Sequence, residues 1–341
     1  MVTIYDIAKL AKVSPMTVSR VINNTGNTSE AIRNKVNNAI DELGYIPNSS
    51  ARSLTLKESK LLTLLISDIA NPFFTKLARG AEDKARELGY QLMLCNTDED
   101  IEKEKVYINT IISTGADGVL FSPANNSSSK HIKLFNKYQI PFVLVDRDLP
   151  DVKVDKVLGD NYSGTKMLLN HLFELGHKNI ALINGPKDVY TAMMRKESYK
   201  EVHNLLGLSI NEKLMFEINY NRNNDAENVV KQLLNLPKDE RPTALFASNS
   251  SIAIDMIKAL HALNVSVPDE ISVVCFDDLD PDSAINPFLT VVMQPAYDFG
   301  YIGTQMLIDR IKNNSLSKKP REVVLKPEFL LRSSTKPIVI S

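Results

Sequence analysis

One segment near the start of this 341-residue chain decides how its first domain folds: Thr3-Ile-Tyr-Asp-Ile-Ala-Lys-Leu-Ala-Lys-Val-Ser-Pro-Met-Thr-Val-Ser-Arg-Val-Ile-Asn-Asn24. Thr3 is a favourable N-cap, and apolar residues follow it at helical spacing, namely Ile4, Ile7, Ala8 and Ala11. Residues 12–14 predict a turn, after which Ser14 caps a second helix that starts at Pro15. The segment therefore predicts two short helices joined by a tight turn.

The second helix has an inner and an outer face. Val18, Val21 and Ile22 are expected to pack inward, and the outer face carries Pro15, Met16, Thr17, Ser19 and Arg20. A third helix, 30–43, closes the core. Such a helix-turn-helix places its second helix in the major groove of DNA, although a helical subdomain that reads no DNA has the same pattern. Residues 1–60 carry an excess of three positive charges and the rest an excess of four negative charges, which favours DNA contact.

The segment that follows the third helix reads Tyr45-Ile-Pro-Asn-Ser-Ser-Ala-Arg-Ser-Leu54. It is too short to form a stable helix alone in water, yet Asn48 is a good N-cap, and Ala51, Arg52 and Leu54 favour helix. These features predict a hinge helix that folds on DNA and inserts Leu54 into the minor groove.

The head resembles the LacI/GalR family of transcription regulators. The resemblance rests on Ile4-Tyr-Asp-Ile-Ala, Val13-Ser-Pro-Met-Thr-Val-Ser-Arg-Val-Ile-Asn23, and Gly44-Tyr-Ile-Pro-Asn with Ala51-Arg-Ser-Leu54, and it continues over essentially the whole chain. It implies a homodimer on a pseudo-palindromic operator, kinked at its centre by two copies of Leu54. At Pro15 and Met16 the sequence cannot be read through side-chain hydrogen bonds, since neither side chain can form a hydrogen bond with a base. The expected DNA-binding residues are Thr3, Pro15, Met16, Thr17, Ser19, Arg20, Asn23, Asn48, Ala51, Arg52 and Leu54.

Composition excludes several classes of protein. Hydrophobic residues make up 43% of the chain and charged residues 24%, as in ordinary globular proteins. No apolar run has the length of a membrane span, and the N-terminus lacks the pattern of a signal peptide. Cys95 and Cys275 both lie in apolar strand-like runs, so we expect buried free thiols in a reducing cytoplasm. We predict a cytoplasmic protein without membrane contact.

Beyond residue 60, apolar strand-like runs alternate with helical segments. The first series of strands is predicted at 61–66, 90–95, 118–121 and 142–145, with helices at 73–88, 101–113 and 132–138. A second series has strands at 156–158, 180–183, 244–247 and 272–276, with helices at 163–175, 194–206, 226–236 and 252–263. Buried strands with helical crossovers indicate an α/β fold in which each lobe is a doubly wound parallel sheet.

The resemblance implies a two-lobed, periplasmic-binding-protein-like body behind the all-α helix-turn-helix head. We expect the head at 1–46, the hinge and linker at 47–60, and the effector-binding and dimerisation domain at 61–341. Lobe 1 is expected at about 61–159 and 292–322, and lobe 2 at about 160–291 and 323–341. The chain would then cross between lobes near Gly159, near 291–294 and near 321–324.

Polar residues stand where the predicted strands end, which is where ligands of parallel sheets bind. They include Ser67-Asp68, Asn96-Thr-Asp98, Asp146-Arg147, Asn184, Asn249 and Asp277-Asp278. Carboxylates, amides and arginine together suit a polyhydroxylated ligand. Taken singly, each Asp or Asn here is also a typical helix cap or turn residue, and Phe74 is a candidate for the core.

The family resemblance narrows this set. The positions that match its effector-contacting residues are Asn71, Phe73, Asp146, Arg195, Tyr220, Asn249, Asp277 and Gln294, with Arg147 as a further contact. The family commonly has Asp where this chain has Ser250, which puts a simple pentose or hexose pocket in question. Because Arg147 and Arg195 are both present, an acidic or phosphorylated sugar is a second hypothesis.

Other activities have little support in the sequence. Glycine-rich phosphate loops, a nucleophile elbow and metal-ligand spacings of histidine are all absent, so neither catalysis nor a cofactor or metal is predicted. A cytosolic solute-binding protein would share the body but not the head. We therefore predict a repressor of carbohydrate-utilisation genes controlled by a small sugar or sugar derivative, with a purine or nucleoside effector as the alternative. The sequence leaves open whether the effector induces or co-represses.

Overall fold

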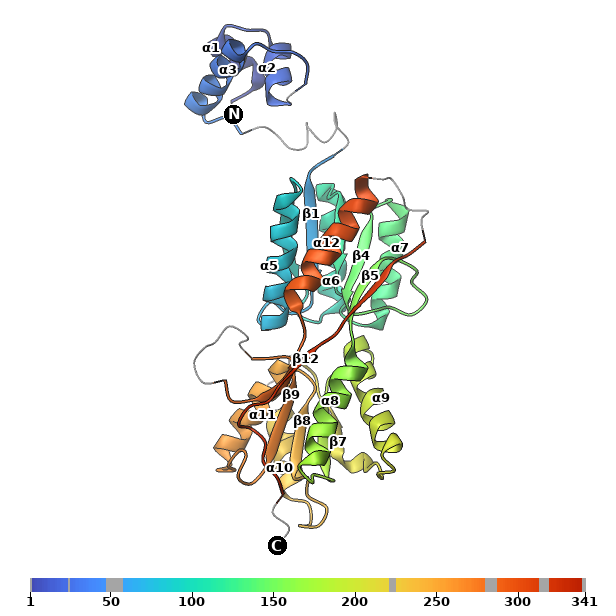
Figure 1. The fold of residues 1–341 in the computed structure, drawn as a ribbon. Coiled ribbons are helices and arrows are strands. Elements are labelled where there is room, and N and C mark those ends of the chain that lie inside the picture. Colours follow the sequence, from blue (N-terminus) through green and yellow to red (C-terminus); the bar gives the residue numbers. More distant parts are fainter. Residues whose placement is uncertain are drawn as a thin grey trace. The chain divides into compact units, whose positions relative to one another are not determined.

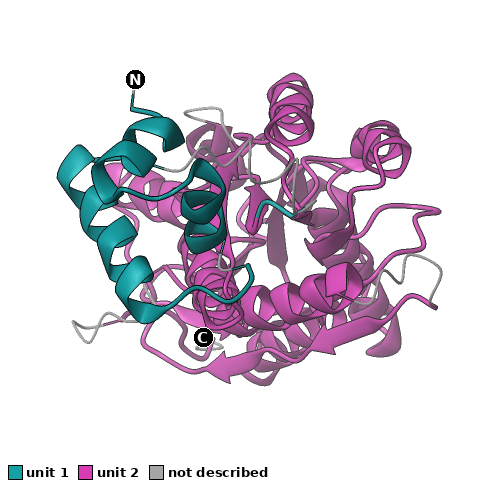
Figure 2. Cartoon of the chain, turned by 90° about the horizontal axis from the view of Figure 1, so that it is seen from above, with its two compact units in different colours: residues 1–59 teal, residues 60–341 magenta. Residues whose placement is uncertain are grey.

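The computed structural model describes residues 2–23, 25–46, 58–220, 225–279, 287–312 and 319–338. The chain forms two compact units, Met1–Ser59 and Lys60–Ser341, which are coloured separately in Figure 2. The predicted hinge residues Asn48, Ala51, Arg52 and Leu54 lie outside the described residues.

The first unit has the three predicted helices: α1 (Ile4–Ala11), α2 (Pro15–Ile22) and α3 (Glu30–Leu43). Thr3 caps α1, since its backbone N–H and its hydroxyl both donate to the Asp6 carboxylate, at 2.8 and 2.7 Å. Ser14 caps α2 by accepting from the Thr17 N–H at 3.1 Å. Their inward faces form one core of Ile7, Ala8, Ala11, Val18, Val21, Val36 and Ala39. The helix-turn-helix prediction is confirmed.

The first lobe of the body is a parallel sheet in the order β11-β5-β4-β3-β1-β2, and its strands β1, β4 and β5 are labelled in Figure 1. Its strands are β1 (Leu61–Ile66), β2 (Gln91–Asn96), β3 (Gly118–Phe121), β4 (Phe142–Asp146), β5 (Lys156–Gly159) and β11 (Glu322–Leu325). Its helices are α5 (Pro72–Glu87), α6 (Ile101–Thr114), α7 (Ser129–Lys137) and α12 (Ala296–Lys312). Helices α5 and α12 lie side by side and share a core through Leu77, Phe299 and Leu307.

The second lobe repeats this architecture, with the strand order β12-β10-β9-β8-β6-β7. The strands are β6 (Ile180–Asn184), β7 (Met215–Glu217), β8 (Ala244–Ala247), β9 (Ser272–Phe276), β10 (Thr290–Met293) and β12 (Glu328–Leu330). The helices are α8 (Asn161–Glu174), α9 (Tyr190–Leu205), α10 (Asp225–Leu234) and α11 (Ser250–Ala262). All pairs are parallel except β10 with β12. The predicted α/β fold with a helical head is confirmed.

Three details differ from the expected layout. Strand β5 pairs with β4 and β11 and so belongs to the first sheet, although its segment was predicted to open the second series. Strand β10 belongs wholly to the second sheet, so the second crossing follows Met293. Strand β11 keeps residues 322–325 in the first sheet, where Val323 and Leu325 pack on the core, so the third crossing follows Leu325.

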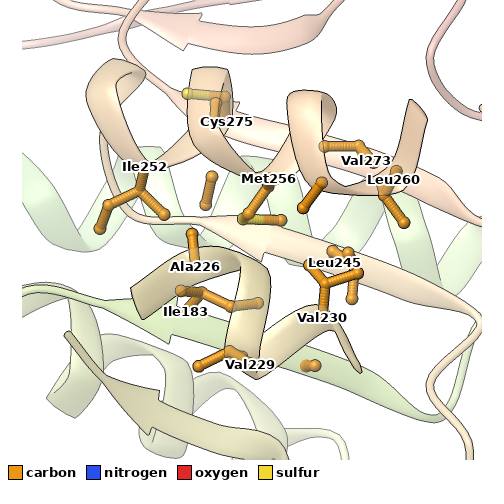
Figure 3. Close-up of a cluster of buried hydrophobic side chains, with 14 of the residues drawn as sticks. Ile183, Ala226, Val229, Val230, Leu245, Ile252, Met256, Leu260, Val273 and Cys275 are labelled. Carbon is orange, nitrogen blue, oxygen red and sulfur yellow. The ribbon is translucent and has the colours of Figure 1, made fainter. Parts of the chain in front are cut away.

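Apolar side chains fill the space between each sheet and its helices. Figure 3 shows part of the second-lobe core, in which Met256 and Leu260 of α11 meet Val229 and Val230 of α10 over the sheet. Cys275 lies in this cluster and Cys95 in a first-lobe cluster, and both are free thiols. Among the described residues, no helix combines the length and apolar character needed to cross a bilayer.

A buried ionic network ties the end of α12 to the sheet of the first lobe. The Asp155 carboxylate, 1% exposed, accepts from Arg310 Nε at 3.0 Å and from Arg321 Nη2 at 2.6 Å. We expect Asp155→Ala to lower the free energy of unfolding by about 3–5 kcal/mol, because it leaves the Arg310 charge buried without its carboxylate. Urea unfolding followed by circular dichroism measures this loss.

The matched control is Asp269→Ala, because the Asp269 side chain is 77% exposed in its ion pair with Lys336. This surface change should cost less than about 1 kcal/mol. Equal losses in the two variants would contradict the structural role assigned to Asp155.

Candidate functional site

The helix-turn-helix exposes part of its predicted DNA-binding set. Met16 is 65% exposed, and Arg20 is also exposed, whereas Pro15, Thr17, Ser19 and Asn23 are half-buried. The Thr17 hydroxyl lies 2.8 Å from the Ser14 hydroxyl, and Asn23 donates to the Ser19 hydroxyl at 3.3 Å. Thr3 is exposed as well, so Thr3, Met16 and Arg20 are the described side chains of this set with most surface free for a DNA groove, and the half-buried ones support the helix itself.

In the body, unsatisfied polar atoms gather at one edge of both sheets. Nine buried side chains of the described residues have a polar atom without a hydrogen-bond partner. Seven of them stand at or directly after the end of a strand: Ser67, Thr97, Ser122, Arg147, Asn184, Ser248 and Gln294. Because buried polar groups normally find partners, this concentration marks the edge as a place for a polar ligand.

The two edges face each other across the lobes. The Ser250 hydroxyl at the start of α11 donates to the Asn71 side-chain oxygen at 3.3 Å, and the Asn126 N–H donates to the Asp188 carbonyl at 2.9 Å. Between them lies a cavity of about 430 Å³. It is lined by Asp98, Glu99, Asp100, Ala124 and Asn125 of lobe 1 and by Pro186, Asp188, Val189, Asn219 and Tyr220 of lobe 2.

Arg195 and Asp277 are buried in lobe 2, outside the lining of this cavity. Arg195 of α9 is buried, donates from Nε to Asn161 at 2.8 Å and from Nη1 to the Ser248 carbonyl, and lies 3.6 Å above the Phe276 ring. Its Nη2 lies 3.8 Å from Asp277 Oδ2, too far for a direct hydrogen bond. Arg195 Nη2 and Asp277 Oδ2, which also accepts from Gln294 Nε2, can therefore bind one hydroxyl group between them.

Asp146 and Arg147 hold the corresponding place in lobe 1. Asp146 at the end of β4 and Asp277 just after β9 both have a positive φ, 66° and 69°. A non-glycine residue seldom adopts this conformation, and such strain is typical of functional sites. Asp146 Oδ2 lies 3.6 Å from Arg147 Nε. The structure thus brings Asp146, Arg147, Arg195 and Asp277 together, as their coupled charges also show.

The predicted amide residues act as helix caps in this structure. The Asn71 side-chain oxygen accepts from the Phe73 N–H at 3.0 Å and caps α5, and Asn249 accepts from the Ile252 N–H at 2.8 Å and caps α11. The side-chain oxygens of Asn71 and Asn249 therefore act as helix caps, which is the alternative role given for such residues in the sequence analysis. Their amide nitrogens stand at the helix starts, next to the cleft. Ser250 occupies the position where an Asp was expected and contacts Asn71 instead.

Phe73, Tyr220 and Gln294 are the remaining predicted residues. Phe73 is 6% exposed and packs edge-on against Phe299, so most of its ring belongs to the core. The Tyr220 hydroxyl fills the space beside Gly185, where a Cβ would lie 2.0 Å from it, and burial raises the pKa of Tyr220 to about 12. Phe74, named as a candidate for the core, is buried there.

Gln294 links Asp277 to the first crossing between the lobes. Its backbone N–H and its Nε2 donate to the Asp277 carboxylate at distances between 3.0 and 3.3 Å. A Cβ at position 159 would lie 1.9 Å from the Gln294 Oε1 atom, so the approach requires Gly159. The oxygen itself is buried without a partner.

Sequence reasoning missed one member of the site, Glu99. Its carboxylate binds Arg147 through both oxygens, at 2.6 and 2.7 Å, although 48 residues separate the two. The only available signal was its position just after β2, in a run of acidic residues that offered no means to choose among them.

Burial sets the charge state of the two aspartates. It raises the pKa of Asp146 to about 6, although Arg147 and Arg195 act in the opposite direction. It also raises the pKa of Asp277, against the effect of Arg195 and of the Gln294 hydrogen bonds. Carboxylate acceptors and guanidinium donors held close together are suited to bind hydroxyl groups. Among the described residues, no group of three or more His, Cys, Asp or Glu is arranged to hold a metal ion.

The fold and the polar cleft together define a DNA-binding transcriptional regulator with a small-molecule-binding body. Residues 3–48 match the model of the bacterial regulatory proteins of the LacI family, and residues 169–335 match that of a periplasmic binding protein-like domain. The ribose operon repressor of Halalkalibacterium halodurans is 38% identical over 341 residues, which cover 98% of each chain. The chain belongs to the LacI family.

Further matches agree with this assignment. The transcriptional repressor PurR of Aliivibrio fischeri strain MJ11 is 32% identical, with 98% of each chain covered. A ribose-bound regulator from Enterococcus faecium has a TM-score of 0.71 at 27% identity, covering 82% of this chain and 100% of that one. The lac repressor dimer on its operator shares the fold with a TM-score of 0.82 at 24% identity, covering 98% and 99%. The curated relatives are transcriptional regulators rather than enzymes.

The raised pKa of Asp146 predicts a pH dependence of ligand binding. A hydroxyl ligand prefers the ionised carboxylate, so binding releases a proton and affinity falls as the pH is lowered through about 6. Between pH 7 and pH 5 the loss should be about tenfold. Calorimetric titrations of the full-length protein with a panel of neutral pentoses and hexoses over this range measure it.

Asp146→Asn is the matched variant, because it cannot take up this proton. Its affinity for a sugar bound by the wild type should be lower at pH 7 and change less between pH 7 and pH 5. Equal pH profiles for the two proteins would assign the titration to another group, such as Asp277, whose pKa is also raised by burial.

Proposed function

We propose that this chain is a homodimeric repressor of carbohydrate-utilisation genes whose operator affinity is set by a small sugar, with a pentose such as ribose as the first candidate. The observation that carries the proposal is the pair of facing carboxylates, Asp146 and Asp277, beside Arg147 and Arg195 in the cleft. Paired carboxylate and guanidinium groups suit neighbouring hydroxyls. The names of the ribose repressor and of the ribose-bound regulator support the same ligand class.

We propose that the parts of the chain have separate roles. Residues 1–46 bind the operator through the outer face of α2, residues 47–60 form the hinge and linker, and the body from residue 61 binds the effector and dimerises. The lac repressor bound to its operator as a dimer supports the stoichiometry. We place the protein in the cytoplasm, where bacterial operators lie, and assign it no catalytic role.

In the effector site, we propose that Asp146, Arg195 and Asp277 bind hydroxyl groups directly. Arg147 Nε and Gln294 Oε1 supply one further donor and one acceptor, because both atoms are buried without partners. Tyr220 and Phe73 line the walls, and the amide nitrogens of Asn71 and Asn249 complete the set. A ligand that joins the lobes favours their closed arrangement by its differential affinity, which typically couples two sites by about 1–3 kcal/mol.

The first experiment tests DNA binding. Random duplex DNA is selected with the purified full-length protein at moderate salt, once without ligand and once with D-ribose. We expect enrichment of a pseudo-palindrome, because a two-fold dimer requires two related half-sites. Absence of any sequence preference in both selections would contradict the proposed regulator.

The second experiment tests the effector site with the selected operator. We expect Asp277→Ala to retain operator affinity and to lose the response to D-ribose, since the variant lacks a carboxylate in the cleft. Fluorescence anisotropy of a labelled operator measures both properties. Asp255→Ala is the control, because this aspartate is exposed on α11 of the same lobe. A normal ribose response in Asp277→Ala would exclude Asp277 from the site.

A further inference from the structure

The Glu99–Arg147 pair changes what the cleft can bind. From the sequence alone, two arginines next to a sugar site favour an anionic ligand such as a sugar phosphate. In the structure, however, the Arg147 Nη1 atom donates to Glu99 and to the carbonyls of Pro123 and Ala124, and its Nη2 atom donates to Glu99. The fork that would grip a phosphate is already occupied by a carboxylate.

Arg147 has two N–H groups left, one on Nε and one on Nη2. Its Nε atom is buried without a hydrogen-bond partner, and Asp146 Oδ2, its neighbour, lies 3.6 Å away. A single N–H group at a carboxylate suits a hydroxyl, which accepts from the one and donates to the other. A phosphate would meet these N–H groups beside the negative charges of Asp146 and Glu99.

The buried charges near the strand ends of the two lobes point in the same direction. Two guanidinium groups, Arg147 and Arg195, face three carboxylates, Glu99, Asp146 and Asp277. All five side chains are at most 13% exposed. With every group ionised the site has one surplus negative charge, so an anionic ligand would enter against repulsion that solvent screens poorly.

The loop after β2 is built to hold Glu99 in this position. Asp98 and Glu99 both have a positive φ, 53° and 57°, which is unusual for non-glycine residues. The Glu99 N–H donates to the Ser67 carbonyl at 3.1 Å, and Asp98 accepts from Asn96 at 2.6 Å. Asp100 then caps α6 by accepting from the Glu102 N–H at 2.7 Å. Strain of this kind persists where the surroundings fix a functional conformation.

We propose that Glu99 is a specificity-determining residue that neutralises Arg147 and makes the cleft select an uncharged polyhydroxylated effector over its phosphorylated form. This inference rests on the proposed effector site. Glu99 acts through Arg147 as a positioning residue. Its loss frees the Arg147 fork and removes one negative charge, so both effects favour an anion.

The test compares wild type with Glu99→Gln, Glu99→Asp and Glu102→Gln, all as full-length protein. Glu99→Gln removes the charge at nearly constant shape, and Glu99→Asp retains it. Glu102→Gln makes the same chemical change on the same segment at a side chain that is 79% exposed. Operator binding and circular dichroism verify that each variant is folded.

Two readouts are used. Calorimetry measures the ratio of the affinities for D-ribose and D-ribose 5-phosphate. Thermal unfolding in inorganic phosphate, compared with sodium chloride of equal ionic strength, measures whether the protein binds an anion that carries no sugar. We expect wild type, Glu99→Asp and Glu102→Gln to prefer ribose by about 100-fold, and Glu99→Gln to lose about tenfold or more of this ratio. Phosphate should raise the unfolding temperature of Glu99→Gln alone.

The outcomes separate this inference from the proposed function. Wild-type binding of ribose, with Glu99→Gln unchanged in both readouts, would overturn the role of Glu99 and leave the sugar effector intact. Equal affinity of wild type for the two sugars would overturn it as well. If wild type bound neither sugar but phosphate stabilised Glu99→Gln alone, the pentose effector would fail and the role of Glu99 would stand. If neither effect occurred, both would fail.

Discussion

Two arginine side chains, Arg147 and Arg195, are buried between the lobes, and their charges have to be balanced there. A buried guanidinium is tolerated only when carboxylates and carbonyl groups surround it, because its removal from water is expensive. In this protein those partners come from loops that follow β2, β3 and β8: Glu99, the carbonyls of Pro123 and Ala124, and the Ser248 carbonyl. The requirement therefore fixes the conformation of several loops at once and gives the cleft a preformed set of donors and acceptors.

The same arrangement connects the effector site to the crossings between the lobes. Gln294 stands directly after β10, where the chain leaves the second sheet, and its amide donates to Asp277. Its oxygen lies against Gly159, where the chain first leaves the other sheet. A ligand that takes up the Asp277 carboxylate thus acts on groups that belong to two of the three crossings. Small changes at such a site are amplified into lobe rotation when the segments that absorb the change are few.

Much of the fold was predictable because it depends on local patterns. The caps Thr3 and Ser14 and the apolar spacing behind them were sufficient for the head, and continuous apolar runs located most central strands. Helix α12 was missed, since Gly300 and Gly303 interrupt its pattern and lower its helix propensity. The short strands β7 and β12 were missed too, because three residues give no usable periodicity.

The site was predictable in position but not in charge. Strand ends located its polar residues, since parallel strands bring their carboxyl ends to one edge. The sequence pattern gave Arg147 a possible anion-binding role, and the structure gives that arginine a carboxylate from a distant loop. No local pattern encodes such a pair, because it depends on how two loops meet across the sheet. The ligand preference of a buried arginine therefore depends on the partner that the fold places beside it.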